Sequence, residues 1–152
     1  VSGPSDLALV RIDPDSLIPM DAEQRARRQD FADTRKKLGD VVLHQLARLP
    51  ERLRVAMFDG RELLVVHGSP TDPSEPISHE LDDEELEALL GDEGADIVVC
   101  GGTHVPFERM AGELRVVNVG SVGDAPEGRV AHFTILTPRA DGDELEQTWV
   151  EY

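Results

Sequence analysis

Leu64-Val65-Val66-His67-Gly68-Ser69-Pro70 and Ile97-Val98-Val99-Cys100-Gly101-Gly102-Thr103-His104 are the two stretches that decide the fold. Each begins with a short continuous apolar run, which is typical of a strand buried on both faces of a sheet. Each run ends abruptly in glycine and histidine. Because loops at the carboxyl ends of parallel strands converge on one crevice, His67 and His104 are predicted to share an edge of an α/β sheet.

The two histidines are candidate metal ligands. A neutral imidazole is a common metal ligand, and the neighbouring glycines let the backbone approach a bound group closely. A single histidine after a strand is more often a plain loop residue. The repetition of the arrangement at His67 and His104 makes a site worth predicting, while the plain-loop interpretation stays open.

Turn signals and hydrophobic periodicity predict the elements around these strands. Asp21 and Gln24 have capping-box spacing, and a helical stripe runs from there until Pro50, weakened at Gly39 by about 1 kcal/mol. A second, acidic helix is predicted from Asp82 or Asp83 to Leu90. The other expected elements are a loop with one short turn over 1–20, hairpins at Asp59-Gly60 and Ala111-Gly112, strands over 129–136 and 144–150, and a turn at Asp141-Gly142.

Composition limits the classes of function. The 152 residues carry a formal net charge of -16, with 31 acidic against 15 basic side chains. Such a surface repels phosphate backbones and anionic headgroups, so nucleic acid is not an expected partner. Cys100 is the single cysteine, which fits a reducing compartment, and no apolar stretch reaches the length of a membrane span. We therefore expect a cytoplasmic protein without a membrane partner.

Three ordered blocks resemble the calcineurin-like metallophosphoesterases, in particular their small bacterial and archaeal members. The segment 64–70 resembles the family's His-Gly block, 101–106 resembles its Gly-His-x-His block, and Asn118-Val119-Gly120-Ser121 is similar to its Asn-Pro-Gly-Ser block. The segment 46–50 is similar to the helix end before the first of these. Val1-Ser2-Gly3-Pro4-Ser5-Asp6 resembles a degraded Gly-Asn-His-Asp block. The resemblance covers most of the chain.

The resemblance implies a fold and a chemistry. The family fold is α/β, a β-sandwich flanked by helices, of which 1–152 would be the C-terminal portion of a single domain without its first strands. Its chemistry is phosphoester hydrolysis by divalent ions that clamp the phosphate and supply a hydroxide. His67 would bind the second metal and His104 the first. Mn, Mg, Ni, Fe and Zn are not distinguished.

The match also departs from the family pattern. Gly102 stands where the first histidine of the Gly-His-x-His block is expected, Pro4 where the metal-binding asparagine is expected, and Ser5 where the catalytic histidine is expected. The family's Asp-x-His and Gly-Asp-x-x-Asp blocks would precede Val1. The implied site is therefore depleted, with one metal ion rather than two.

Two functions within this family remain open from the sequence, beside a third and more distant one, a small-molecule-binding α/β domain that resembles the family by chance. The first is a metal-dependent phosphodiesterase or phosphatase acting on a small phosphoester. The second is a non-catalytic binding or assembly module of the same fold. Without the first strands, Leu63–Val66 and Ile97–Cys100 are expected to leave an open apolar edge, closed by a homo-oligomer or by the missing N-terminal segment.

Overall fold

The computed structural model describes residues 1–139 and 142–152, which form two compact units. Residues 2–50 form a helical unit, and Val1 with residues 51–152 forms a sheet unit. The predicted Asp141-Gly142 turn falls partly on Asp141, outside the described residues. The fold is mixed α/β, as predicted.

The helical unit contains a helix where the sequence predicted only a turn. Helix α1 (Pro4–Arg11) begins at Gly3, whose amide donates to the Asp6 carboxylate at 2.9 Å. Proline at the first helical position and an acidic residue in the first turn both favour a helix start. The expectation of a loop over 1–20 was wrong for this segment. Its hydrophobic periodicity is weak, and the helix start is marked instead by Gly3, Pro4 and Asp6. A short 3-10 helix (Pro14–Ser16) follows.

Helix α2 (Ala22–Leu46) confirms the long helix and its start. The Asp21 carboxylate accepts a hydrogen bond of 2.7 Å from the Gln24 amide. Gly39 does more than weaken the helix, because its φ of 69° and ψ of 169° are not helical and place a kink there. The predicted stripe is only half-buried along Phe31, Leu38, Val42 and Leu46, and Leu49 is exposed.

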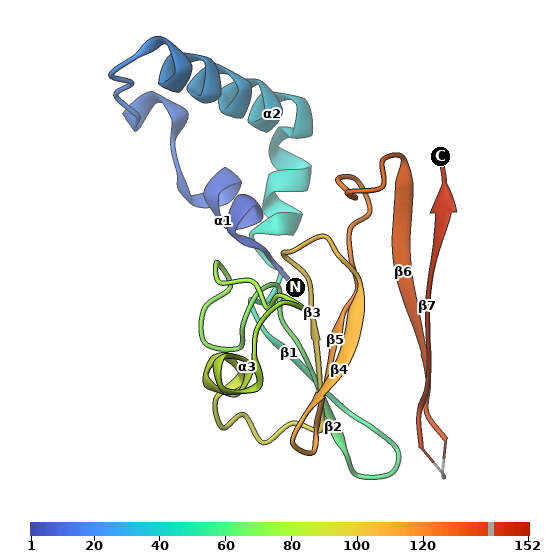
Figure 1. Ribbon diagram of the computed structural model, residues 1–152. Helices are drawn as coiled ribbons and strands as arrows, with labels where there is room; N and C mark the ends of the chain where they lie inside the picture. The colour runs from blue at the N-terminus through green and yellow to red at the C-terminus, as the bar shows by residue number, and fades with distance from the viewer. Residues whose placement is uncertain (140–141) are drawn as a thin grey trace. The chain divides into compact units, whose positions relative to one another are not determined.

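The sheet unit is built on five strands in the order β1-β2-β3-β5-β4 (Figure 1). Strands β2 (Glu62–Val65), β3 (Ile97–Cys100) and β5 (Leu114–Asn118) run parallel to one another. Strands β1 (Leu53–Ala56) and β4 (Phe107–Ala111) are antiparallel to their neighbours and close the two predicted hairpins.

The expected open edge at β2 and β3 does not exist. β2 pairs with β1 on one side and with β3 on the other, and β3 pairs with β2 and β5. The prediction was wrong because it placed the absent strands beside these two. The hairpin strand β1 covers the edge instead.

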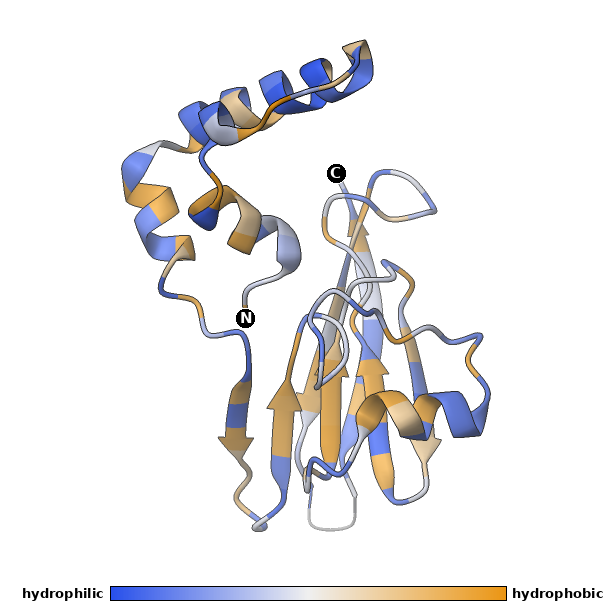
Figure 2. Ribbon diagram, turned by 90° about the vertical axis from the view of Figure 1, so that its left-hand side faces the viewer, coloured by the Kyte–Doolittle hydropathy of each residue, from blue (hydrophilic) through white to orange (hydrophobic). Residues whose placement is uncertain are grey.

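The core lies between this sheet and helix α3 (Asp83–Leu90), which starts and ends as predicted. Asp82 caps it in a capping box and Gly91 follows it. Buried apolar residues include Leu64, Val98 and Val116 from the strands and Leu86 from the helix. Figure 2 shows the contrast between the mostly hydrophobic strands of the sheet and the mostly hydrophilic α2.

A second, two-stranded sheet pairs β6 (Val130–Thr137) with β7 (Glu144–Glu151), both as predicted. Its alternation is confirmed, since His132 is buried while Phe133 and Ile135 are exposed. A side-chain hydrogen bond of 2.7 Å from Gln147 to the main-chain oxygen of Asn118 joins it to β5. Within the described part of the chain, no helix combines the length and hydropathy needed to cross a membrane.

Candidate functional site

Three loops meet the same edge of the five-stranded sheet. They follow β2, β3 and β5, the strands that run parallel. Because parallel strands end on one side, the loops with His67, His104 and Ser121 share that side. The sequence predicted this placement for His67 and His104. We call it the strand-end edge, formed by residues 66–70, 101–106 and 118–124.

His67 lies half-buried directly beyond β2. The Val66 amide donates to the Val99 oxygen at 2.9 Å, and the His67 oxygen accepts from the Gly101 amide at 2.8 Å. These bonds continue the pairing of β2 with β3 past the strands themselves. The main chain of His67 is therefore fixed against the loop that carries His104.

The loop after β3 contains two residues with positive φ. Gly102 has a φ of 84°, which L side chains rarely adopt, and a β-carbon there would lie 3.1 Å from the Pro76 side chain. The loop is thus shaped for glycine at the position where the family expects a histidine. His104 itself has a φ of 65°, and it is the single non-glycine residue with a positive φ among the residues that the structure describes. Such backbone strain concentrates at functional sites.

The loop after β5 is organised by Asn118, whose side chain is fully buried. Its Nδ2 donates to the Gly101 oxygen at 2.9 Å and to Thr103 Oγ1 at 3.0 Å. Its Oδ1 accepts from the Gly120 amide at 3.0 Å. One side chain therefore joins the ends of β3 and β5.

His104 also meets the third loop. Its Nδ1 lies 3.3 Å from Oδ2 of Asp124, whose amide donates to the Ser121 hydroxyl at 3.0 Å. A carboxylate beside Nδ1 favours a proton on that nitrogen, which leaves Nε2 as the atom free to bind a ligand. The Ser121 hydroxyl therefore serves the turn.

His132 supports the turn from β6. Its Nδ1 accepts from the Ser121 amide at 3.2 Å, and its own amide donates to the Ser121 oxygen at 2.9 Å. Gly120 has a φ of 76° and presses so closely on this ring that a β-carbon would lie 2.6 Å from Nδ1. His132 is therefore buried against the strand-end edge.

The residues described do not by themselves fit a metal ion. Over 1–139 and 142–152, no group of three His, Cys, Asp or Glu side chains lies close enough together to hold one. A stable divalent site takes at least three protein ligands of this kind. His67 and His104 therefore need further ligands before the strand-end edge can bind a metal.

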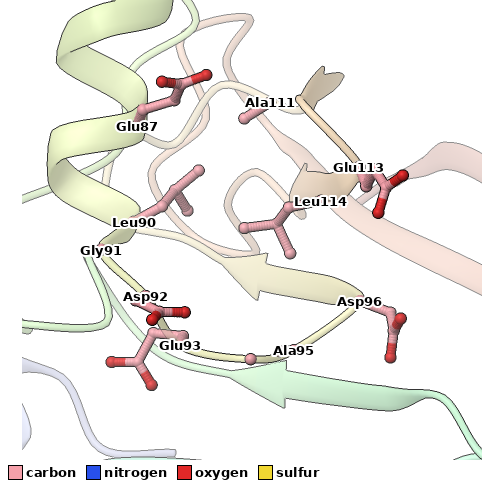
Figure 3. Close-up of a pocket in the computed structure, with 11 residues that line it drawn as sticks. Glu87, Leu90, Gly91, Asp92, Glu93, Ala95, Asp96, Ala111, Glu113 and Leu114 are labelled. Atoms are coloured by element: carbon pink, nitrogen blue, oxygen red, sulfur yellow. The ribbon is translucent and has the colours of Figure 1, made fainter.

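An acidic cavity of about 520 Å³ lies away from the strand-end edge, beside the residues that start β3 and β5 (Figure 3). Asp96 precedes β3 and Leu114 begins β5. Glu87, Asp92 and Glu113 also line the cavity. The concentration of carboxylates repels a phosphoester, so this cavity does not compete with the strand-end edge as a substrate site.

The remaining candidate residues have structural roles. Cys100 is buried, and burial raises the pKa of its thiol to about 12, as for an inert core cysteine. Pro4 and Ser5 lie in the first turn of α1. His44 and His79 are exposed.

Sequence reasoning placed Asn118 in the third family block but gave it no role at the edge, and it did not identify Asp124. The signal for Asn118 was a single amide at the end of the apolar run Leu114-Arg115-Val116-Val117-Asn118, just before a glycine turn. Nothing in the sequence marked Asp124 among 31 acidic residues.

The fold is that of a phosphoesterase-type α/β domain. The model of the "Calcineurin-like phosphoesterase superfamily domain" matches residues 19–141, which is most of the chain. The chain therefore belongs to the calcineurin-like phosphoesterase superfamily. No curated protein matches it.

Two solved structures are similar over nearly the whole chain. Hypothetical protein PH1004 from Pyrococcus horikoshii OT3 is 25% identical, with a TM-score of 0.78 over 99% of this chain and 61% of its own. A metallophosphoesterase from Sphaerobacter thermophilus is 22% identical, with a TM-score of 0.74 over 99% of this chain and 64% of its own, and shows the shared fold. The chain thus spans less than two thirds of either structure.

Proposed function

We propose that the protein is a metal-dependent phosphoesterase whose site is the strand-end edge, with His67 and His104 as metal ligands. The observation that carries the proposal is the placement of both histidines at the carboxyl ends of adjacent parallel strands, β2 and β3. Membership of the superfamily supports the reaction class, phosphodiester or phosphomonoester hydrolysis.

The charge of the protein supports a metal requirement. A small phosphoester is an anion, and a net charge of -16 repels it unless positive charge is concentrated locally. A bound divalent ion is often the largest local charge in a site and would supply it. Two histidine ligands do not distinguish among Mn, Mg, Ni, Fe and Zn as the bound ion.

The missing ligands are proposed to come from outside the residues described. The similar structures are longer, since this chain covers 61% and 64% of them. In this proposal 1–152 is the C-terminal portion of one domain, acting in the cytoplasm. The exposed side chains of Phe133, Ile135 and Val150 on β6 and β7 are the surface where an N-terminal segment or a second copy would pack.

The second candidate is a non-catalytic binding or assembly module. Two observations favour it: the described residues bring no three ligands together, and the backbone at Gly102 is shaped for glycine where the family has a ligand. In this alternative His104 serves only its pairing with Asp124.

Metal content separates the two candidates. The protein, in the longest form available, is loaded with Mn²⁺, passed over a desalting column and analysed for elements. The phosphoesterase proposal expects close to one retained ion per chain, lost in His67→Ala and in His104→Ala and kept in His79→Ala, whose histidine is exposed. No retained metal in any variant would favour the binding module.

A further inference from the structure

We propose that Asn118 is the positioning residue of the strand-end edge: its carboxamide holds Thr103, and through Thr103 sets the orientation of His104. The inference rests on the proposed function only in assigning His104 to the site.

The hydrogen-bonding capacity of Asn118 is used almost entirely on loops. Its Nδ2 donates to the loop after β3, to the Gly101 oxygen at 2.9 Å and Thr103 Oγ1 at 3.0 Å, and makes a longer contact of 3.5 Å with the Ile77 oxygen. Its Oδ1 serves its own turn through the Gly120 amide. A buried carboxamide is tolerated only when satisfied in this manner. The neighbouring buried positions of β5 are the apolar Val116 and Val117. The polar side chain at 118 is therefore explained by its hydrogen bonds to the loops and not by hydrophobic packing.

Thr103 transmits this constraint around His104. Its Oγ1 lies 3.4 Å from both the amide and the oxygen of Val105, so one hydroxyl bonds Asn118 on one side and the residue after His104 on the other. Between them His104 has a φ of 65°. A non-glycine residue keeps such a conformation only where surrounding contacts impose it.

The consequence is the direction of the imidazole. In this backbone conformation Nδ1 faces Asp124 at 3.3 Å, and Asp124 belongs to the loop that Asn118 also caps. Two contacts therefore join the loop after β3 to the loop after β5: the Asn118 carboxamide bonds Gly101 and Thr103, and His104 pairs with Asp124. Releasing the carboxamide should let His104 relax to an ordinary backbone conformation and leave Asp124.

Three substitutions isolate the proposed link. Asn118→Asp keeps the shape and the Oδ1 acceptor but removes both donors. Thr103→Val removes the hydroxyl at nearly constant shape, and Thr103→Ser restores it. Gln147→Ala is the local control, because the Gln147 side chain bonds the main-chain oxygen of Asn118, at 2.7 Å, and not its carboxamide.

The test is imidazole NMR of ¹⁵N-labelled, metal-free protein at one fixed pH and without substrate. We expect the His104 ring signals to shift by more than a line width in Asn118→Asp and Thr103→Val, and to stay in place in Thr103→Ser and Gln147→Ala. Leu64→Ala, which weakens the core, should lower the melting temperature without moving these signals.

Unmoved His104 signals in folded Thr103→Val would overturn the proposal, as would equal shifts in Leu64→Ala. Thr103→Val keeps the test decisive if Asn118→Asp does not fold. The NMR readout needs neither metal nor turnover. If the expected shifts are seen in a protein that hydrolyses no phosphoester, the positioning role of Asn118 is upheld and the proposed function fails.

Discussion

The main-chain oxygen of His67 accepts a hydrogen bond of 2.8 Å from the amide of Gly101, beyond the last paired residues of β2 and β3. The two histidine loops therefore leave the sheet as a bonded pair rather than as independent segments. This relationship makes the strand-end edge a single structural unit, and the predictions below test its parts.

Gly120→Ala should be strongly destabilising. Its φ of 76° and the 2.6 Å approach of a β-carbon to the His132 ring combine strain with a clash, and we expect a loss of about 3 kcal/mol in the free energy of unfolding. Gly112→Ala is the matched control, since its φ is 60° but nothing lies within 4 Å. It should cost about 1 kcal/mol. Urea unfolding measures both, and equal losses would show that the His132 contact carries no weight.

Breaking the ion pair between Arg61 and Asp143 should also destabilise the fold. Arg61 Nη2 lies 2.7 Å from Oδ1 of Asp143, whose side chain is fully buried. Arg61→Met leaves that carboxylate without its guanidinium partner and also breaks the pairing of Arg61 with Asp59, so the free energy of unfolding should fall clearly. Arg139→Met, which breaks an exposed pair with Glu144, should cost under about 1 kcal/mol. Chemical denaturation that finds the two variants alike would contradict the structural role of Asp143.

Leu64→Ala should lower the free energy of unfolding by about 2–5 kcal/mol, because Leu64 is fully buried in the middle of the sheet. Val55→Ala on the outer strand β1, where the side chain is 43% exposed, should cost under about 1 kcal/mol. The comparison is made by thermal and urea unfolding. A small loss in Leu64→Ala would mean that β2 is not central to the core.

Cys100 should resist alkylation in the folded protein. Burial raises the pKa of its thiol to about 12, so the reactive thiolate is scarce at pH 8 and reagent access is blocked. Iodoacetamide labelling followed by mass spectrometry should find it unmodified in buffer and modified in urea. Rapid labelling under native conditions would show that β3 opens readily.

The strand-end edge was predictable because local signals and sheet topology agreed there. Apolar runs ending in glycine and histidine at His67 and His104 located the edge without any knowledge of distances. Helix α1 was missed because its evidence lay in its cap at Gly3 rather than in periodicity. The roles of Asn118 and Asp124 were missed because they depend on loops that are far apart in sequence. The covering of β2 by β1 was missed because a hairpin signal predicts that two strands pair but not which edge of the sheet the hairpin closes.

The most direct test of the proposed phosphoesterase is hydrolysis of bis(4-nitrophenyl) phosphate with added Mn²⁺, measured for the longest available form of the protein and its variants. We predict turnover that falls roughly 100-fold or more in His67→Ala and in His104→Ala, as the loss of a ligand implies, and that His44→Ala, altered on an exposed helix position, leaves unchanged. Equal turnover in all four proteins, or none in any, would contradict the assignment of the strand-end edge as the active site.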